Sequence, residues 1–385
     1  MNKVLEPTPA LDNGYYPNPT RRILGNGCFS KIPDLLASLG PRSMLLVLGE
    51  KSFRVSSYYT RLDEMLAPYR VVHVAPVAPN PTQDFIQEQI ERLKGKTLDL
   101  VLAIGGGSVL DVGKILATIP EQGQTDLQMY MNGEPPIMAS QLPLVAVPTT
   151  AGTGSEVTPY ASLETKEKKK VTISHPSFYP KVALIDPQMC YSMPAYITAS
   201  TGFDALSQAI ESFWSIHATP FSQTHSLRAI GLILEGLIEA CRDPFHPQAR
   251  FDMSLASCEA GLAIAQTKTT AVHSVSYPIT THFGIAHGHA CALTLASFVR
   301  FNAPTLQDGG HPLLATFRAR DYQDMAKKIE TMMDLVGLQR SLSKLGVDES
   351  GIDLIVREGL RPDRAKNNPR AVSPQDLQKI LWEIR

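Results

Sequence analysis

The sequence predicts a two-domain protein of the α/β plus all-α class: an N-terminal Rossmann-like parallel-sheet domain at residues 21–195 and a C-terminal helical domain at residues 196–385. The first observation is that short apolar, often β-branched runs alternate with helical stretches as far as about residue 190. Such alternation is typical of a parallel sheet covered on both faces. The second is that strand patterns stop after Asp186, where stretches with an apolar period of about 3.6 residues indicate helices.

The individual elements follow from local patterns. Residues 1–20, which contain several prolines, predict an irregular N-terminal arm. Apolar runs predict buried strands at residues 43–48, 70–74, 98–104, 144–147 and 182–185, and prolines at 135, 136 and 143 predict a loop before the fourth of these. Periodic apolar residues predict long helices over residues 226–241 and 251–265.

Composition excludes several classes of function. A formal net charge of -1 argues against a large surface for nucleic acid or anionic membrane. No uninterrupted apolar run is long enough to cross a membrane, and the N-terminal arm lacks the pattern of a secretory signal. The five cysteines are scattered and form no C-x-x-C pair, which is typical of reduced thiols in a cytoplasmic protein. We therefore expect a cytoplasmic protein that acts on a small molecule.

Four of the ten histidines lie close together in the sequence, at positions 273, 282, 287 and 289. Imidazole is the commonest metal ligand and the usual proton-transfer group near neutral pH. Well upstream of them, Asp204 and Gln208 stand four apart in a helical pattern, so both side chains leave the same helix face. A carboxylate and two imidazoles on separate helices predict a divalent-metal site. The alternative is a set of core or helix-end histidines.

A glycine-rich motif follows the third predicted strand, in the segment Ala103–Lys114. Glycines let the backbone approach a ligand closely, and the N–H groups at a helix N-terminus bind phosphate oxygens. We expect Ser108 to cap this helix, with Asp111 at the capping-box position. The alternative is a purely structural strand-to-helix turn.

A second motif, Val147–Thr158, follows the fourth predicted strand and is rich in hydroxyls and glycines. By itself it is equally compatible with a polar loop of turn-forming residues. Together the two motifs suggest a site for pyrophosphate and ribose at the carboxyl ends of the sheet strands.

In order and spacing, these motifs resemble the iron-containing (group III) alcohol dehydrogenases. The resemblance rests on residues 105–111, 148–158, 202–206 and 273–288, together with Asn368-Pro-Arg370. It implies a dehydroquinate synthase-like fold, a homo-oligomer, and hydride transfer between NADH or NADPH and a small-molecule carbonyl compound. It also implies one divalent metal ion that polarises the carbonyl oxygen, with Fe²⁺ as first choice and Zn²⁺ or Mn²⁺ as alternatives.

The family's site residues carry over by position. Those that match cofactor contacts are Gly106, Gly107, Ser108, Asp111, Thr149, Thr150, Thr153, Ser155 and Lys170, although the lysine run around position 170 also suits a solvated turn. Those that match metal ligands are Asp204, His273 and His287. Glu50 stands where a carboxylate would bond the adenosine ribose, which favours NADH, whereas the adjoining Lys51 and Ser52 could accept the 2′-phosphate of NADPH.

The sequence departs from the family at two site positions. Gln208 replaces the usual fourth histidine ligand, and its neutral amide oxygen is a poorer donor that would coordinate directly or through water. Tyr277 replaces a histidine that relays protons. We expect the Tyr277 phenol, or a water relayed through His282, to protonate the product alkoxide.

A third departure concerns the substrate. Lys268, Thr269 and Thr270 replace glycines and aliphatic residues before the first ligand histidine, and a cation with hydroxyls suggests an anionic substrate. This segment resembles the branch of the family that reduces phosphonoacetaldehyde to 2-hydroxyethylphosphonate. Phosphonopyruvate would suit the same chemistry. If Lys268 instead caps a helix or faces solvent, the alternative is a generic alcohol dehydrogenase or a glycerol dehydrogenase-like enzyme. Because the usual histidines at positions 208 and 277 are missing, a second alternative is a binding subunit without catalytic activity.

Overall fold

A computed structural model of the chain describes residues 3–5, 18–50, 53–54, 56–122, 124–133, 136–138, 141–306 and 311–385. The chain divides into two compact units, which are described separately: unit 1 comprises residues 1–150 and 155–192, and unit 2 comprises residues 151–154 and 193–385. Most of the predicted N-terminal arm lies outside the described residues, as do Lys51, Ser52 and Pro135. No helix among the described residues has the length and apolar character that crossing a bilayer requires.

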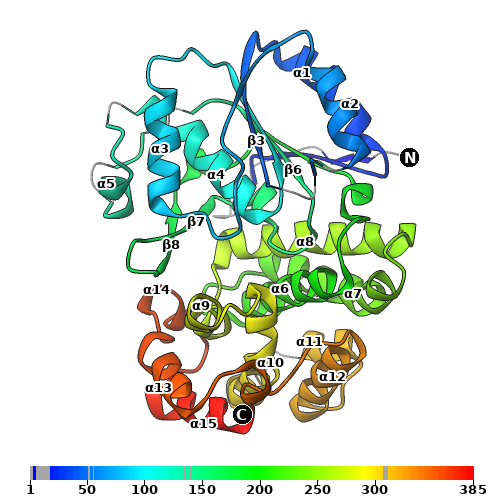
Figure 1. Ribbon diagram of the computed structural model, residues 1–385. Coiled ribbons are helices and arrows are strands. Elements are labelled where there is room, and N and C mark those ends of the chain that lie inside the picture. The colour runs from blue at the N-terminus through cyan, green and yellow to red at the C-terminus, as the bar shows by residue number, and fades with distance from the viewer. Residues whose placement is uncertain are drawn as a thin grey trace. The chain divides into compact units, whose positions relative to one another are not determined.

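Unit 1 is built on a seven-stranded sheet with the order β1-β2-β9-β6-β5-β3-β4. The strand β1 (Lys3–Leu5) pairs antiparallel with β2 (Arg21–Leu24), and the other neighbours pair parallel. The remaining strands are β3 (Ser43–Leu48), β4 (Arg70–His73), β5 (Leu100–Gly105), β6 (Leu144–Pro148) and β9 (Val182–Ile185). Figure 1 labels β3 and β6 of this sheet. The predicted parallel sheet is confirmed.

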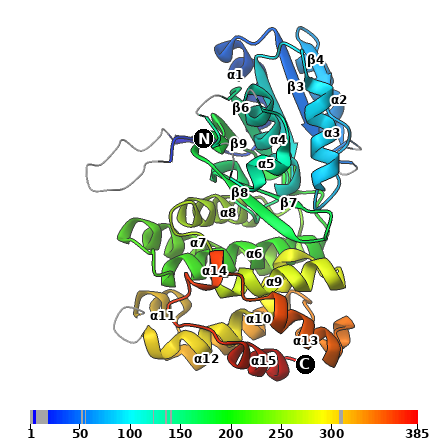
Figure 2. The same cartoon turned by 90° about the vertical axis from the view of Figure 1, so that its left-hand side faces the viewer.

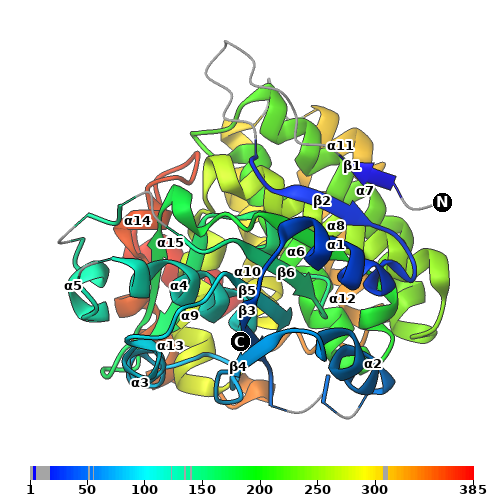
Figure 3. The same cartoon turned by 90° about the horizontal axis from the view of Figure 1, so that it is seen from above.

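Helices cover both faces of this sheet, because alternate residues of each buried strand point to opposite sides. Leu45 and Val47 of β3 pack with α3 (Gln83–Leu93) and α4 (Gly107–Thr118). Met44 and Leu46 pack instead with α1 (Ile32–Leu39) and α2 (Ser57–Leu66). Figure 3 shows the two helix layers on either side of the strands, with the short α5 (Leu127–Met131) beside α3 and α4. The strands are therefore held rigidly from both faces.

A hairpin of β7 (Tyr160–Glu164) and β8 (Lys170–Ser174) lies outside the main sheet and was not predicted. Its first strand alternates half-buried and buried residues, with Ala161 and Leu163 facing the core. This alternation is the sequence pattern that would have predicted it.

Unit 2 contains only helices among its described residues, as predicted. The predicted helices correspond to α7 (Pro220–Arg242) and α8 (Pro247–Thr267), which pack with each other and with α6 (Ala195–Trp214) (Figure 2). The domain boundary proposed from the sequence, at 195–196, falls in the first turn of α6. The other α-helices of unit 2 are α9 (Ala271–Phe283), α10 (His287–Asn302), α11 (His311–Phe317), α12 (Tyr322–Leu335), α13 (Glu349–Glu358), α14 (Pro362–Ala365) and α15 (Pro374–Glu383).

Candidate functional site

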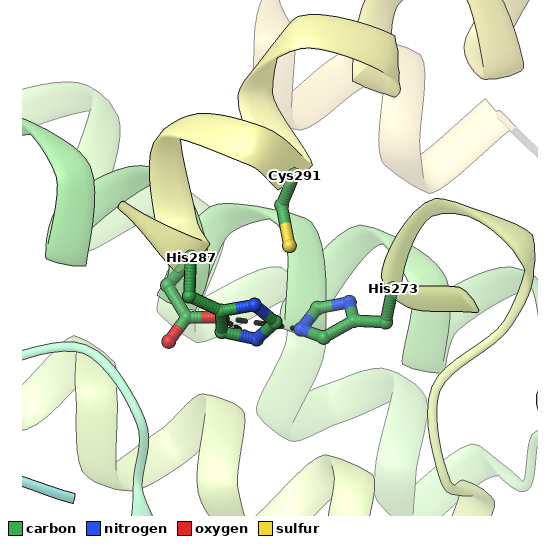
Figure 4. Close-up of side chains that lie close together, drawn as sticks. His273, His287 and Cys291 are labelled. Atoms are coloured by element: carbon green, nitrogen blue, oxygen red, sulfur yellow. Dashed lines mark hydrogen bonds and ion pairs between the residues drawn. The ribbon is translucent and has the colours of Figure 1, made fainter. Parts of the chain in front are cut away.

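Three of the expected metal ligands meet in unit 2, each from a different helix. Asp204 comes from α6, His273 from α9 and His287 from the first position of α10. The Nε2 atom of His273 lies 3.2 Å from Asp204 Oδ1, and the Nε2 atom of His287 lies 3.9 Å from the same oxygen. Figure 4 shows the two imidazole rings directed toward each other. The structure therefore brings an oxygen and two nitrogen donors to one point.

Cys291 joins these three residues, and sequence reasoning missed it. Ligand atoms of Asp204, His273, His287 and Cys291 all lie within 4.8 Å of one another. Cys291 is fully buried, and Figure 4 shows its sulfur directed toward the two histidines. It follows His287 by four residues on α10, so both side chains leave the same face of the helix. That spacing is the signal that could have found it.

Gln208, the fourth ligand expected from the sequence, lies beside Asp204 on α6. Its amide nitrogen donates a hydrogen bond of 3.1 Å to Asp204 Oδ1. Its amide oxygen is buried and has no hydrogen-bond partner among the described residues. A buried carbonyl oxygen without a partner lowers the stability of the fold. This atom is therefore suited to coordinate a metal ion, or to accept a hydrogen bond from a water bound to one.

Glu211 holds His273 in place and was also missed. One carboxylate oxygen of Glu211 contacts Nδ1 of His273. The other accepts hydrogen bonds from the backbone N–H of Thr270 at 2.9 Å and from the Thr270 hydroxyl at 2.7 Å. This arrangement keeps a proton on Nδ1 and leaves the lone pair of Nε2 facing Asp204, as a metal ligand requires. Glu211 follows Asp204 by about two helical turns, which is the signal for its position.

The electrostatics of the cluster favour a cation. Burial alone would lower the pKa of His273, but the neighbouring Cys291, Glu211 and Asp204 together raise it well above its ordinary value. The structure thus stabilises positive charge at the position where the donor atoms meet.

Close helix packing sets the distance between the ligands. Gly288 follows His287 at the start of α10, and a Cβ atom there would lie 1.9 Å from the backbone oxygen of Ser200 and 2.9 Å from Cβ of Asp204. Only glycine lets the α10 backbone approach α6 this closely. The pair His287–Gly288 is therefore required for His287 to reach Asp204.

In unit 1, the predicted cofactor motifs follow the ends of the neighbouring strands β5 and β6. The backbone N–H of Thr149 donates to the oxygen of Gly105 at 3.0 Å, and a Cβ at Gly106 would meet Thr150 at 3.3 Å. Adjacent carboxyl ends of parallel strands form the crevice in which nucleotides bind. Gly106 and Gly107 open helix α4 at this edge, where its N–H groups suit phosphate oxygens.

The predicted capping box at this helix is wrong. Gly106 is the N-cap of α4, and no side chain caps it. Ser108 lies inside the helix, where its hydroxyl accepts a hydrogen bond of 3.2 Å from the backbone N–H of Asn80. The prediction failed because the helix begins earlier than the Ser108 pattern implied.

Asp111 and Ser155 bond to each other within unit 1, with Ser155 Oγ donating to Asp111 Oδ1 at 2.6 Å. Fully buried Lys114 donates to Ser155 Oγ at 2.7 Å and to the backbone oxygen of Tyr160 at 2.7 Å. Burial lowers the pKa of Lys114 to about 8 and raises the pKa of nearby Glu156 to about 7. These contacts tie the second motif to helix α4 and thereby shape the predicted cofactor site.

The other predicted cofactor residues are placed as follows. Thr149 and Thr150 lie after β6 in unit 1, whereas Thr153 belongs to unit 2. Lys170 is half-buried at the start of β8, opposite Glu164. Glu50 is exposed just after β3.

The residues predicted to face the substrate are brought together only in part. The ring of Tyr277 lies 5.7 Å from that of His287, next to the ligand cluster. His282 is not brought there: it contacts Glu358 at 2.9 Å and lies on the opposite face of α9 from His273.

In the segment before α9, residues 268–270, one side chain is exposed and two are buried. Lys268 is exposed at the C-terminal cap of α8, as one alternative for this residue anticipated, and has a φ of 58°. Thr269 is buried, and the buried Thr270 hydroxyl is engaged by Glu211.

Comparison with known proteins places the chain in a family. Residues 19–187 match the family model described as iron-containing alcohol dehydrogenase, and residues 198–384 match that of the Fe-containing alcohol dehydrogenase family, C-terminal. The chain belongs to the iron-containing alcohol dehydrogenase family. It is similar to the phosphonoacetaldehyde reductase of Streptomyces viridochromogenes (32% identical, 83% of each chain) and to long-chain-alcohol dehydrogenase 1 of Geobacillus thermodenitrificans (29% identical, 93% of each chain). Among solved structures it resembles the sulfoacetaldehyde reductase of Bifidobacterium kashiwanohense in complex with NAD⁺, with 33% identity and a TM-score of 0.90 over 96% of this chain and 98% of that one.

As a member of the iron-containing alcohol dehydrogenases, this chain is an oxidoreductase, and the cofactors of the family are a nicotinamide nucleotide and a divalent metal ion. The residues present fit the metal. Asp204, His273 and His287 would hold it, and the unpaired oxygen of Gln208 and the thiol of Cys291 stand beside them. When bound, the ion supplies Lewis-acid polarisation of a substrate carbonyl.

Proposed function

We propose that this enzyme uses NAD(P)H to reduce an anionic aldehyde, most simply phosphonoacetaldehyde to 2-hydroxyethylphosphonate. The observation that carries the proposal is the pair of similarities to a phosphonoacetaldehyde reductase and a sulfoacetaldehyde reductase, at 32% and 33% identity. The names of both relatives denote a two-carbon aldehyde whose second carbon carries a tetrahedral oxyanion. Sulfoacetaldehyde is accordingly the second candidate substrate.

In this proposal each group of residues has a defined task. Asp204, His273 and His287 hold the metal ion, with Gln208 as a further oxygen donor. Tyr277, whose ring adjoins His287, supplies the proton to the product oxygen. The nicotinamide nucleotide is bound by residues of the two glycine-containing motifs and by one lysine. They are Gly106, Gly107, Ser108, Asp111, Thr149, Thr150, Thr153, Ser155 and Lys170.

The choice of nucleotide and the assembly state belong to the same proposal. Exposed Glu50 would repel a 2′-phosphate, so we expect NADH to be preferred over NADPH. Titration of the free protein with each nucleotide, followed by nicotinamide fluorescence, tests this preference. We further propose that the enzyme is a cytoplasmic homo-oligomer. Light scattering after size-exclusion chromatography would measure the mass of the assembly.

The experiment that tests the substrate compares kcat/KM for phosphonoacetaldehyde, sulfoacetaldehyde and butanal at saturating NADH. Butanal is the matched neutral aldehyde. We expect either anionic aldehyde to exceed butanal by at least tenfold, and the larger of the two values identifies the substrate. Equal or higher values for butanal would overturn the proposal in favour of a general alcohol dehydrogenase.

Lys268 and Thr269 stay in the proposal as contacts for the charged end of the substrate, whereas the Thr270 hydroxyl already donates its hydrogen bond to Glu211. Because Lys268 is exposed, its interaction with an anion is screened, and we expect Lys268→Ala to lower kcat/KM for the anionic aldehyde only about threefold. Measuring butanal with the same variant separates this charge effect from damage to the fold.

A further inference from the structure

A short C-terminal segment, residues 361–367, lies against the first half of α9. The backbone N–H of Arg361 donates a hydrogen bond of 2.8 Å to Ser274 Oγ. The side-chain amide of Asn367 donates at 3.0 Å to the backbone oxygen of Thr269. These two contacts anchor the segment, which includes α14, at both of its ends. Its side chains are therefore placed next to the part of α9 that carries the ligand His273.

Two arginines of this segment stand over the ring of Tyr277. The guanidinium carbon of Arg364 lies 4.8 Å from the centre of that ring, and that of Arg361 lies 5.6 Å from it. The Tyr277 ring is itself 5.7 Å from the His287 ring. The Tyr277 ring therefore adjoins both the guanidinium of Arg364 and the ligand cluster.

Positive charge is in excess in this segment. Arg361, Arg364 and Lys366 are cationic, whereas Asp363 is its only acidic residue. Arg361 Nε lies 3.3 Å from the Asp363 carboxylate, and Arg364 Nη1 is in close contact with it. The side chain of Arg364 is only 12% exposed, so its charge is less screened by water than that of a surface residue. An anion bound beside it would therefore be attracted more than by an exposed arginine.

We infer that Arg361 and Arg364 bind the tetrahedral oxyanion of the substrate, a phosphonate or a sulfonate, and so select anionic aldehydes. This inference rests on the proposed function. Guanidinium groups match such oxygens through paired, charge-assisted hydrogen bonds, which a lysine cannot form. The charged end would then be recognised at α14, beside the Tyr277 ring, which also adjoins the ligand cluster.

The available span agrees with a two-carbon aldehyde. With carbon–carbon bonds of about 1.5 Å, the carbonyl and phosphonate oxygens of such a molecule lie roughly 5 Å apart. A charge-assisted hydrogen bond adds about 2.8 Å to a guanidinium nitrogen. The distance to be spanned is at most the 4.8 Å from Arg364 to the Tyr277 ring followed by the 5.7 Å from that ring to His287. Because this is an upper limit, one such molecule is long enough to place its carbonyl beside the histidines and its phosphonate at the arginines.

The test uses Arg364→Ala and Arg364→Lys in the metal-loaded enzyme, with Arg357→Ala as control. Arg357 belongs to the neighbouring helix α13 and is 69% exposed. We expect Arg364→Ala to lower kcat/KM for phosphonoacetaldehyde, or for sulfoacetaldehyde if that is the better substrate, by about 10- to 100-fold. Arg364→Lys should recover part of this loss, and butanal turnover should change by less than threefold in every variant. Equal losses for both aldehydes would show that Arg364 acts through the fold or through Tyr277 and not on the oxyanion, and would overturn the inference.

A second readout separates the inference from the proposed function. Ethylphosphonate, which has no carbonyl, should inhibit butanal reduction by the wild type competitively and should inhibit Arg364→Ala at least tenfold less. If the wild type prefers butanal yet shows this difference in inhibition, the proposed substrate is wrong and the anion site stands. If the wild type prefers the anionic aldehyde and Arg364→Ala keeps that preference, the anion site is wrong and the function stands.

Discussion

Replacing Glu211 with glutamine should weaken metal binding although Glu211 is not itself a proposed ligand. The fully buried carboxylate accepts hydrogen bonds from Thr270 through one oxygen and contacts Nδ1 of His273 through the other. A glutamine can keep only one acceptor oxygen. If its NH₂ group faces Nδ1, the proton of the His273 ring moves to Nε2, the nitrogen that points at Asp204, and the lone pair needed for coordination is lost.

The size of the effect follows from the role of such partners. Loss of a group that orients a ligating histidine typically costs about 10- to 100-fold in metal affinity, which is about 1.4–2.7 kcal/mol. Because Glu211 is completely buried and makes several hydrogen bonds at once, we expect the upper part of this range. Competition with a chromophoric chelator measures the dissociation constants for Zn²⁺ and Co²⁺ directly, without any assay of activity.

Glu259→Gln is the matched control. Glu259 is another buried glutamate of unit 2 that pairs with a histidine, in this case His225, but it lies outside the ligand cluster. We expect this variant to bind metal like the wild type. Our account of Glu211 would be refuted if Glu211→Gln kept its metal affinity within twofold, or if the two variants lost affinity equally.

Three further predictions test the packing, the donor set and the buried charges. Gly288→Ala should lower the bound metal to less than half of the wild-type content, because its Cβ would overlap the Ser200 oxygen. The control Gly231→Ala, which has open space around it, should keep the wild-type content, and elemental analysis measures both. Cys291→Ser should abolish the near-ultraviolet sulfur-to-metal band of the Co²⁺-loaded protein, and a spectrum without such a band in the wild type would exclude a thiolate ligand. Burial raises the pKa of Glu156 from 4.5 to about 7, so the folded state binds more protons and the free energy of unfolding should fall as pH rises through this window. Urea unfolding across that range should show a flatter dependence for Glu156→Gln, and identical slopes would contradict the assignment.

The parts of the fold that sequence reasoning predicted are those determined by local pattern. The strand β9 was predicted at residues 182–185 because four buried apolar residues are sufficient evidence in a doubly covered sheet. The hairpin of β7 and β8 was missed because the preceding loop is rich in hydroxyls and glycines, and the alternation of Ala161 and Leu163 is short. Strands of such an isolated hairpin are not buried on both faces, so they lack the continuous apolar run that reveals a central strand in the sequence.

The site shows the same limit. Asp204, His273 and His287 were predicted together because they match the ligand positions of the family pattern, and the structure brings them together. Glu211 could not be distinguished from any other helical glutamate, since its partner His273 lies 62 residues further along the chain. The arginines over Tyr277 depend on a tertiary contact between α14 and α9, which no local pattern encodes.

The identity of the fourth donor decides which metal the protein selects. Gln208 offers a neutral amide oxygen where the family pattern has a histidine, and such an oxygen is a poorer donor for iron. A thiolate from Cys291 would replace the missing donor and complete a set of one oxygen, two nitrogens and one sulfur, which suits tetrahedral Zn²⁺ better than Fe²⁺. If Cys291 coordinates, protein purified without chelator should contain zinc and Cys291→Ser should shift its content toward iron. If Gln208 provides the fourth donor instead, Gln208→His should raise the affinity for iron and Cys291→Ser should leave the metal content unchanged.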